Sequence, residues 1–542
     1  MDKKMNEGWR GRATVFAIAA ALGGSALLGV AAPVTAWAAS ANPSVTIVPA
    51  ENNGTPRYQA YRLFTAQIDD KNNNAQQIAW DASVSPEAQA KIIAKLDDLT
   101  GGAYTKWAAN KGDKTLPQNV LEFMSAQIAG SAHTTDAHDQ SVVDAETFAM
   151  DFAAWLSSAE SGVQPVGTAT ANQVFEGTEG YYLFVTKTKT GKVATSPIWF
   201  PLGGSANKVF EKAGVPTVDK TLENQNAGSG QIGENLPFKV TATLPGNYNS
   251  YGTFKVVLKD TPTNLKIAAE SVKVMSGTRD ITKAAGVTVD VAGGTALTVT
   301  IDNLKVADPD ATANTKLVVT YNAQLTADAG HKPGANTNKV VYEFSSNPGV
   351  STETSTDADT SVPVYSFLLN LTKKDKNTDE ALNGAKFIIK NQAGGYYDKD
   401  TKTWTLDEAA AKAESKLLAT ENGALSVMGL DKGTFTLTEV VAPDGYELPA
   451  NPNITLVVTP EYDAAGGMTS LTVKADGAIV STKDVASADK AEGTLSVTAV
   501  NDKNVALAMT GAEGVGMAGA GVVALGLVWY AVRSRRDRAN QQ

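Results

Sequence analysis

A lysine, an acid and an asparagine stand in phase with the apolar residues of expected β-strands in the C-terminal third of the chain. Lys373 continues the alternation of apolar residues at 367, 369 and 371. Glu439 continues the alternation of Phe435 and Leu437. Asn501 continues the alternation of apolar residues at 495, 497 and 499. Alternate side chains of a strand point to the same face, so we expect these polar groups to be buried. The neighbouring Lys374 has the opposite phase, which favours Lys373 as the inward lysine.

The middle third repeats this pattern with the same kinds of residue. Lys220 lies between Val218 and Leu222, Asp260 follows Phe254, Val256 and Leu258, and Asn338 precedes Val340, Tyr342 and Phe344. Asn336 has the same phase as Asn338, so the sequence leaves both asparagines open.

Burial of these groups predicts a specific chemistry. Loss of water lowers the pKa of a lysine and raises that of a carboxylic acid, so both become neutral more readily. A neutral amine is a nucleophile, and a neutral acid can polarise a carboxamide and pass a proton to the leaving ammonia. The product is a Lys–Asn isopeptide bond. The alternative is a lysine that reaches solvent or forms a salt bridge, and the repetition in two regions favours the covalent bond.

The elements that must position these residues are mainly strands. Thr, Val, Ala and Gly are abundant and charged residues make up only 19%, which suits strands and turns. Short strand patterns separated by turn residues predict immunoglobulin-like β-sandwiches at 213–350 and 360–505, with a linker near 345–360. Residues 40–212 predict a β-sandwich with helical insertions at 86–99, 120–128 and 148–156.

Other chemistry has weak support in the sequence. The net charge of −10 and the absence of cysteine in 542 residues disfavour nucleic-acid binding and disulfide crosslinks. His133 and His138 lie in a small-residue loop, which favours a solvated loop over a metal site. Asp375, Asn377 and Asp379 imitate the start of a calcium loop but lack its later ligands, so we expect a hairpin turn. We expect no metal and no cofactor.

Both ends of the chain are expected to be processing segments. Basic residues precede an apolar run from 13 to about 30, and Ala36-Trp37-Ala38 follows it, which is typical of a signal peptide at 1–39. At the other end, Leu507-Ala508-Met509-Thr510-Gly511 precedes an apolar run at 514–532 and a basic tail. That run is just long enough to cross a bilayer, and the tail places its end on the cytoplasmic side. The alternative is an ordinary tail anchor.

Two motifs carry a resemblance to a known family. The 507–542 segment resembles a sortase cell-wall sorting signal of the Leu-Pro-x-Thr-Gly type, with Ala508 at the proline position. The segment from Phe435 to Tyr446 resembles the E-box of Gram-positive pilins, with Val440 at a common threonine position, and 382–387 resembles the start of the same domain. Together they make the chain similar to major (backbone) pilins of the SpaA and type 2 fimbria kind.

The resemblance implies CnaA-like and CnaB-like folds for 213–350 and 360–505. It also implies that Glu439 and Asp260 assist autocatalytic bonds, which would join Lys373 to Asn501 and Lys220 to Asn338. Sortase would cleave after Thr510 and transfer the new end to a lysine of another subunit. The usual Tyr-Pro-Lys acceptor motif is absent, and Val209-Phe210-Glu211-Lys212 occupies its place. Lys212 is therefore the expected acceptor, with Lys208 as the alternative.

The expected function is that of a structural subunit of a sortase-polymerised pilus that serves adhesion, and not that of an enzyme on external substrates. Its implied partners are a pilin-specific sortase, a housekeeping sortase, other pilin subunits and peptidoglycan, and its implied location is the cell wall. The alternative is a monomeric wall-anchored adhesin or an ancillary pilin. The sequence does not identify the adhesion ligand.

Overall fold

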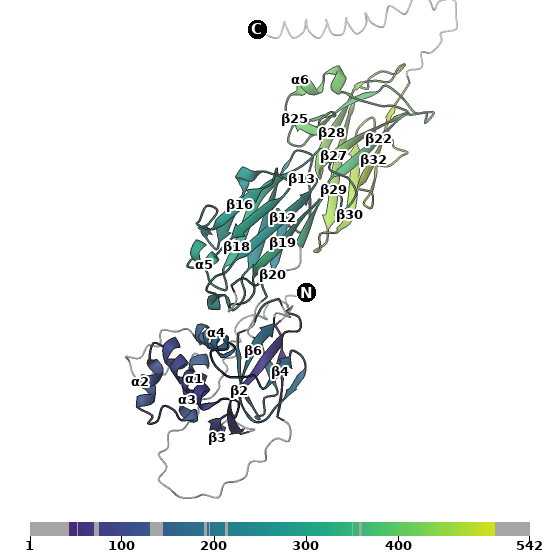
Figure 1. Cartoon of the computed structure of the whole chain (residues 1–542). Coiled ribbons are helices and arrows are strands. Elements are labelled where there is room, and N and C mark those ends of the chain that lie inside the picture. Colours follow the sequence, from purple (N-terminus) through teal and green to yellow (C-terminus); the bar gives the residue numbers. More distant parts are fainter. Residues whose placement is uncertain are drawn as a thin grey trace, which may run out of the picture.

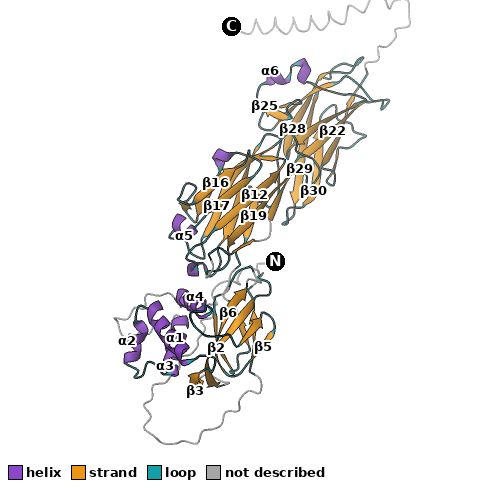
Figure 2. Ribbon diagram, viewed as in Figure 1, coloured by secondary structure: helices purple, strands orange, loops and turns teal. Residues whose placement is uncertain are grey.

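The computed structural model describes residues 43–503, except 51–52, 70–74, 130–144, 189–191, 195, 212–214, 349–350 and 357–359. The described residues fold into three consecutive domains that follow one another along an elongated axis (Figure 1). Strands dominate, and the longer helices gather in the first domain (Figure 2). The expected mainly β fold is confirmed.

The first domain is built on a sheet of order β3-β2-β6-β7, with β4 paired to β2. Its strands are β2 (Arg57–Ile68), β3 (Ala75–Trp80), β4 (Gly167–Thr170), β6 (Gly180–Thr188) and β7 (Ile198–Leu202). A second sheet has the order β5-β1-β8 and comprises β1 (Ser44–Val48), β5 (Val174–Glu176) and β8 (Lys208–Phe210). The helices are α1 (Pro86–Leu99), α2 (Ala103–Ala109), α3 (Pro117–Ala129) and α4 (Ala145–Leu156).

The alternation of β6 explains the layers of this domain. Leu183 packs into the core formed with the helices, whereas Phe184 packs into the core formed with the smaller sheet. Helix α1 begins where the sequence predicts, because the Ser85 hydroxyl accepts a hydrogen bond from the Ala88 N–H at 3.2 Å and Pro86 opens the first turn. The predicted β-sandwich with helical insertions is therefore present.

The second domain is a sandwich of two sheets. One has the order β15-β14-β18-β11-β9, with β13 beside β18; the other has the order β10-β21-β19-β12-β17-β16, with β20 beside β19. The strands are β9 (Val218–Leu222), β10 (Gly228–Ser229), β11 (Asn235–Thr243), β12 (Val256–Thr263), β13 (Leu265–Ile267), β14 (Lys273–Ser276), β15 (Arg279–Asp280), β16 (Val287–Val291), β17 (Leu297–Ile301), β18 (Lys316–Leu325), β19 (Thr337–Ser345), β20 (Thr354–Thr356) and β21 (Thr360–Tyr365); a short helix α5 spans Leu304–Ala307.

The third domain is a second sandwich. One sheet has the order β27-β22-β32-β31, and the other has the order β25-β24-β23-β28-β29-β30, with β26 beside β23. The strands are β22 (Phe367–Asp375), β23 (Lys386–Asn391), β24 (Tyr396–Asp398), β25 (Thr403–Thr405), β26 (Leu418–Ala419), β27 (Ala424–Leu430), β28 (Gly433–Val441), β29 (Asn453–Tyr462), β30 (Met468–Asp476), β31 (Ser487–Asp489) and β32 (Thr494–Asn501); helix α6 spans Glu408–Ala411.

The boundary between the last two domains differs from our expectation. Strand β21 pairs with β19, so residues 360–365 complete the second domain instead of opening the third. The expected linker also contains β20, which pairs with β19. The physical reason is that Val362 and Val364 alternate inward and join the second core, although polar residues surround them.

Direct contacts fix the junction between these two domains. The Tyr365 hydroxyl donates to the Gly466 carbonyl at 3.0 Å, and its ring stacks on Tyr462 with centroids 5.1 Å apart. Asn226 Nδ2 donates to the Ala464 carbonyl at 2.6 Å. These contacts hold the sandwiches end to end, in the arrangement seen in Figure 1.

Candidate functional site

The core of the third domain contains a hydrogen-bonded set of one lysine, one asparagine and one acid. Lys373 Nζ donates to Asn501 Oδ1 at 2.6 Å, and Asn501 Nδ2 donates to Glu439 Oε1 at 3.0 Å. Glu439 Oε2 lies 3.7 Å from Lys373 Nζ and has no hydrogen-bond partner within the described residues. The amine, the carboxamide and the acid thus contact one another in a closed triangle.

Strand pairing brings these side chains together. Strands β22 and β32 are parallel neighbours in which Lys373 is opposite Ala499, so Asn501 lies two residues further along on the same inner face. Glu439 comes from β28 in the facing sheet, where it alternates inward with Phe435 and Leu437. The lysine and the asparagine therefore belong to one sheet, and the acid comes from the other.

Burial controls the charges in this site. The exposed fractions are 0% for Lys373, 1% for Glu439 and 3% for Asn501. Loss of water lowers the pKa of Lys373 to about 8 against the opposing effect of Glu439, and burial raises the pKa of Glu439. Proton transfer from the ammonium to the carboxylate is thereby eased, and it would leave a neutral amine beside the carboxamide.

The second domain places its groups on different strands. Lys220 on β9 donates to Asp260 Oδ2 on β12 at 2.5 Å, across the two sheets. Its ammonium also lies over the rings of Phe238 and Tyr321, with Nζ-to-centroid distances of 5.5 and 5.7 Å. Burial lowers the pKa of Lys220 to about 8 and raises that of Asp260. Burial therefore shifts the pKa values of the amine and the acid in the same directions as in the third domain.

Asn338 reaches this pair through a residue that the sequence did not single out. Its Nδ2 donates to the Tyr321 hydroxyl at 2.8 Å, and that hydroxyl donates to Asp260 Oδ2 at 2.7 Å. In the described part of the chain, no hydrogen bond joins Lys220 or Asp260 directly to Asn338. Tyr321 alternates with Val319 and Ala323 on β18 and therefore resembles an ordinary core aromatic in the sequence.

The two open asparagines have different surroundings. Asn336 Oδ1 accepts from the Gly330 N–H at 2.9 Å, and Asn336 Nδ2 donates to the Gly330 carbonyl at 2.8 Å and to the Val364 carbonyl at 3.1 Å. These bonds hold a loop and β21. Asn338 Oδ1, in contrast, has no partner among the described residues. The geometry favours Asn338 as the reacting asparagine.

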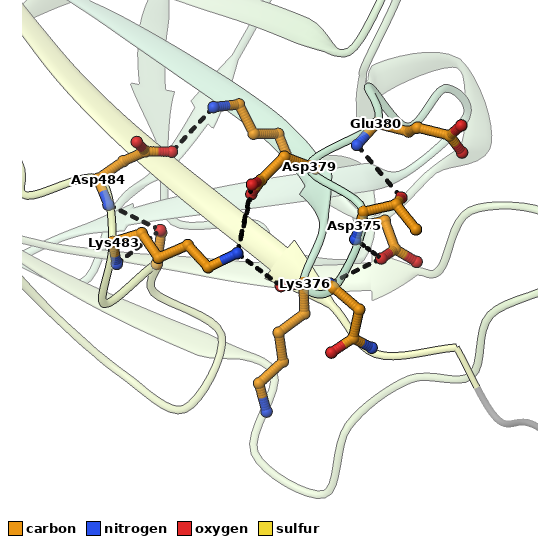
Figure 3. A network of polar contacts seen from close by, with 10 residues as sticks. Asp375, Lys376, Asp379, Glu380, Lys483 and Asp484 are labelled. Carbon is orange, nitrogen blue, oxygen red and sulfur yellow. Dashed lines mark hydrogen bonds and ion pairs between the residues drawn. The ribbon is translucent and has the colours of Figure 1, made fainter.

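A network of charged residues lies at the surface of the third domain, beside the end of β22. Lys483 Nζ contacts Asp379 Oδ2 at 3.2 Å, and Lys374 Nζ contacts Asp484 Oδ2 at 2.9 Å (Figure 3). Asp375 Oδ1 accepts from the N–H groups of Asn377 and Thr378, which forms the expected turn instead of a calcium loop. Lys374 thus points outward, as its phase predicts, and Lys373 inward.

The residues expected to link subunits are only partly described. Lys212, Thr510 and the rest of the expected sorting signal lie outside the described residues, as do the expected signal peptide and the apolar run at 514–532. Lys208 lies exposed on β8. Glu211, next to the expected acceptor, is buried and accepts hydrogen bonds from the Ala50 N–H at 2.8 Å, from Asn53 Nδ2 at 2.9 Å and from the Tyr58 hydroxyl. Among the described helices, none is long and apolar enough to span a membrane.

Comparison with known proteins identifies one domain. Residues 368–476 match the family model of the SpaA prealbumin-like fold domain, which covers the strands that carry Lys373 and Glu439. The resemblance of this region to SpaA-type domains is therefore confirmed. No curated protein sequence matches the chain.

Solved pilin structures are similar to the chain at low identity. The T6 backbone pilin of serotype M6 Streptococcus pyogenes has 13% identity and a TM-score of 0.48, over 85% of this chain and 98% of that one. The full-length major pilin SpaD of Corynebacterium diphtheriae has 14% identity and a TM-score of 0.44, over 85% and 98%. The pilus 2b backbone protein of group B streptococcus has 22% identity and a TM-score of 0.35, over 52% and 97%.

Proposed function

We propose that this protein is a structural subunit of a sortase-assembled surface pilus, reinforced by Lys373–Asn501 and Lys220–Asn338 isopeptide bonds. The observation that carries the proposal is the closed triangle of Lys373, Asn501 and Glu439 in a dry core. Burial of a charged pair costs free energy, so a lysine and an acid kept together in a dry core favour a role in chemistry over a role in stability. The E-box around Glu439 and the sorting signal support the same function.

The third-domain reaction balances with the groups present. Lys373 gives one proton to Glu439, and its neutral Nζ then attacks Asn501 Cγ. The bond between Cγ and Nδ2 breaks, and Glu439, which already contacts Nδ2, delivers the proton to it. The attacking nitrogen loses its second proton to the carboxylate, so the products are an amide, ammonia and a neutral acid.

The positions of the bonded residues suit a fibre under tension. Lys373 lies on the first strand of the third domain and Asn501 at the end of its last described strand. A pull on the chain would pass through the covalent bond before any strand could peel away. The bond would close a loop across a separation of 128 residues, and closure of a loop of that size contributes about 5 kcal/mol on the chain-entropy treatment used for disulfides.

Polymerisation requires a donor and an acceptor. We propose that a pilin-specific sortase cleaves after Thr510 and transfers the acyl end to Lys212 of the next subunit, with Lys208 as the alternative. A housekeeping sortase would then attach the fibre to peptidoglycan, which would place the protein on the cell wall. The fibre would serve adhesion.

Mass spectrometry of the folded, full-length protein tests the internal bonds. Each bond removes one ammonia, so the wild-type chain should be lighter than its sequence mass by two ammonia molecules. Glu439→Ala should restore one of them, and branched tryptic peptides should locate the other at Lys220 and Asn338. An unchanged deficit in Glu439→Ala would refute the assigned role of Glu439.

Cell-wall extracts test the assembly. A ladder of detergent-resistant, high-mass species that collapses in Lys212→Ala supports a polymerised subunit with that acceptor. Collapse in Lys208→Ala instead moves the acceptor to β8. A single wall-linked band in the wild type contradicts polymerisation and identifies a monomeric adhesin.

A further inference from the structure

The two candidate crosslinking sites differ in how the acid reaches the asparagine. Glu439 contacts Asn501 Nδ2 directly at 3.0 Å, whereas Asp260 has no hydrogen bond to Asn338 within the described residues. The aspartate side chain is one methylene shorter than a glutamate. The Tyr321 hydroxyl fills the gap and contacts both Asp260 Oδ2 and the leaving nitrogen of Asn338.

We propose that Tyr321 is a catalytic proton relay in the second domain, carrying the proton from Asp260 to Asn338 Nδ2 as the isopeptide bond forms. This inference rests on the proposed crosslinking function. It assigns a tyrosine to a step that the third domain performs with its acid alone.

The geometry provides a continuous proton path. Lys220 Nζ lies 2.5 Å from Asp260 Oδ2, which lies 2.7 Å from the Tyr321 hydroxyl, which in turn lies 2.8 Å from Asn338 Nδ2. The exposed fractions of these residues are 2% for Lys220, Asp260 and Tyr321, and 0% for Asn338. Bulk water does not reach these groups, and the Tyr321 hydroxyl is the group in contact with both ends of the gap.

The step balances in atoms and charge. Lys220 gives a proton to Asp260, and its neutral Nζ attacks Asn338 Cγ. In the tetrahedral intermediate Nδ2 has become basic, so Asp260 gives its proton to the Tyr321 oxygen while Tyr321 gives its own proton to Nδ2. The Cγ–Nδ2 bond breaks and ammonia leaves. The new amide nitrogen passes its surplus proton to Asp260, and Tyr321 ends as it began.

The surroundings keep Tyr321 suited to this role. Its ring stacks on Phe238 with centroids 5.6 Å apart, which fixes the position of the hydroxyl. Burial, together with the nearby Asp260 carboxylate, raises the pKa of Tyr321 well above its usual value, so the phenol holds its proton until Nδ2 can accept it. A relay needs this kind of group, because it must donate and accept in the same step.

The test follows both bonds during refolding of the full-length chain from urea, using protein that has never folded and so carries no crosslink. The amount of each branched tryptic peptide is measured at successive times after refolding begins. The third-domain bond is the internal reference in every sample. Tyr321→Phe keeps the ring but removes the hydroxyl. We expect it to slow the Lys220–Asn338 bond by about 10²-fold, the lower range for loss of a general acid–base group, while the Lys373–Asn501 bond forms at the wild-type rate.

Tyr342→Phe is the matched control. Tyr342 is a buried tyrosine in the same domain whose hydroxyl donates to the Thr243 carbonyl at 3.1 Å, away from the reacting groups. It should leave both rates unchanged. If both bonds form in Tyr321→Phe at the same rates as in the wild type, the relay is wrong. Absence of the Lys220–Asn338 bond from the wild type itself would instead show that the proposed crosslink is wrong.

A second variant separates the relay from folding. If Tyr321→Phe prevents the second domain from folding, 3-fluorotyrosine at position 321 keeps the shape and the hydroxyl but is a stronger acid. The relay predicts a change of at least about twofold in the second-domain rate, with the third-domain rate unchanged. An unchanged second-domain rate in this variant would overturn the inference.

Discussion

The Tyr446 hydroxyl donates a hydrogen bond to Asp375 Oδ2 at 2.7 Å and so ties the end of the E-box segment to the strand that carries Lys373. Asp375 also accepts two backbone hydrogen bonds from the following turn. The tail of the motif thus has a structural partner, Asp375, two residues beyond the expected nucleophile. Its contribution can be measured through the titration of Asp375.

Tyr446→Phe should make the stability of the third domain depend less steeply on pH in acid. The hydrogen bonds from Tyr446 and the turn lower the pKa of Asp375 from 3.8 to about 2. A lowered pKa contributes stability that is present above the ordinary value and is lost as the pH falls through the folded value. Without the Tyr446 hydrogen bond the folded-state pKa of Asp375 moves back toward 3.8, so the variant has less stability to lose in acid. It should be less stable than the wild type at about pH 5, and the two should converge as the pH falls toward about 2, as measured by urea unfolding.

A double-mutant cycle controls this measurement. In an Asp375→Asn background the carboxylate is gone, so Tyr446→Phe should no longer change the pH dependence. The same change in pH dependence in both backgrounds would show that Tyr446 acts through another contact.

Lys373→Met and Lys374→Met should behave differently, although the residues are neighbours. Lys373 Nζ contacts Asn501 in the core, whereas Lys374 Nζ pairs with Asp484 at the surface. Lys373→Met should abolish the third-domain bond, restore the mass of one ammonia and lower the free energy of unfolding by about 5 kcal/mol. Lys374→Met should keep the bond, and its stability should change by less than about 1 kcal/mol. Loss of the bond in Lys374→Met alone would reverse the assignment.

Formation of the third-domain bond should have a bell-shaped pH dependence. The reaction needs one proton shared between Lys373 and Glu439, because the acid must first accept it and later donate it. Below the raised pKa of Glu439 both groups are protonated, and above the Lys373 pKa of about 8 both are deprotonated. The rate during refolding should therefore fall on both sides, with the alkaline limb near pH 8. A rate that is flat between pH 5 and about 10 would contradict this mechanism.

Asn338→Ala and Asn336→Ala should separate bonding from folding in the second domain. Asn338→Ala removes the expected electrophile, so the Lys220 branched peptide should disappear. Asn336→Ala removes hydrogen bonds to Gly330 and Val364, and at about 1 kcal/mol each it should lower the free energy of unfolding by about 2–3 kcal/mol while the branched peptide persists. A Lys220 peptide that disappears only in Asn336→Ala would assign the crosslink to Asn336.

The inward placement of the reacting residues could be predicted because strand phase is a local property. Lys373 alternates with Phe367, Leu369 and Leu371, and the same argument separates it from Lys374. No knowledge of the partner strand is needed for this step. The SpaA-type domain was likewise readable from the E-box, since a contiguous motif records local structure.

Tertiary structure decided which polar groups meet. Phase could not choose between Asn336 and Asn338, which point the same way, and their different hydrogen bonds depend on the loop at Gly330 and on β21. Phase also could not assign β21 to the second domain, because its place depends on pairing with β19.

Tyr321 shows most clearly where prediction from strand alternation ends. Alternation with apolar residues on β18 is enough to place its ring in the core. Only the packing of two sheets placed its hydroxyl between Asp260 and Asn338, which come from strands of the facing sheet. Alternation sets the direction of a side chain from its nearest neighbours, whereas contact between sheets depends on the register of strands far apart in the chain.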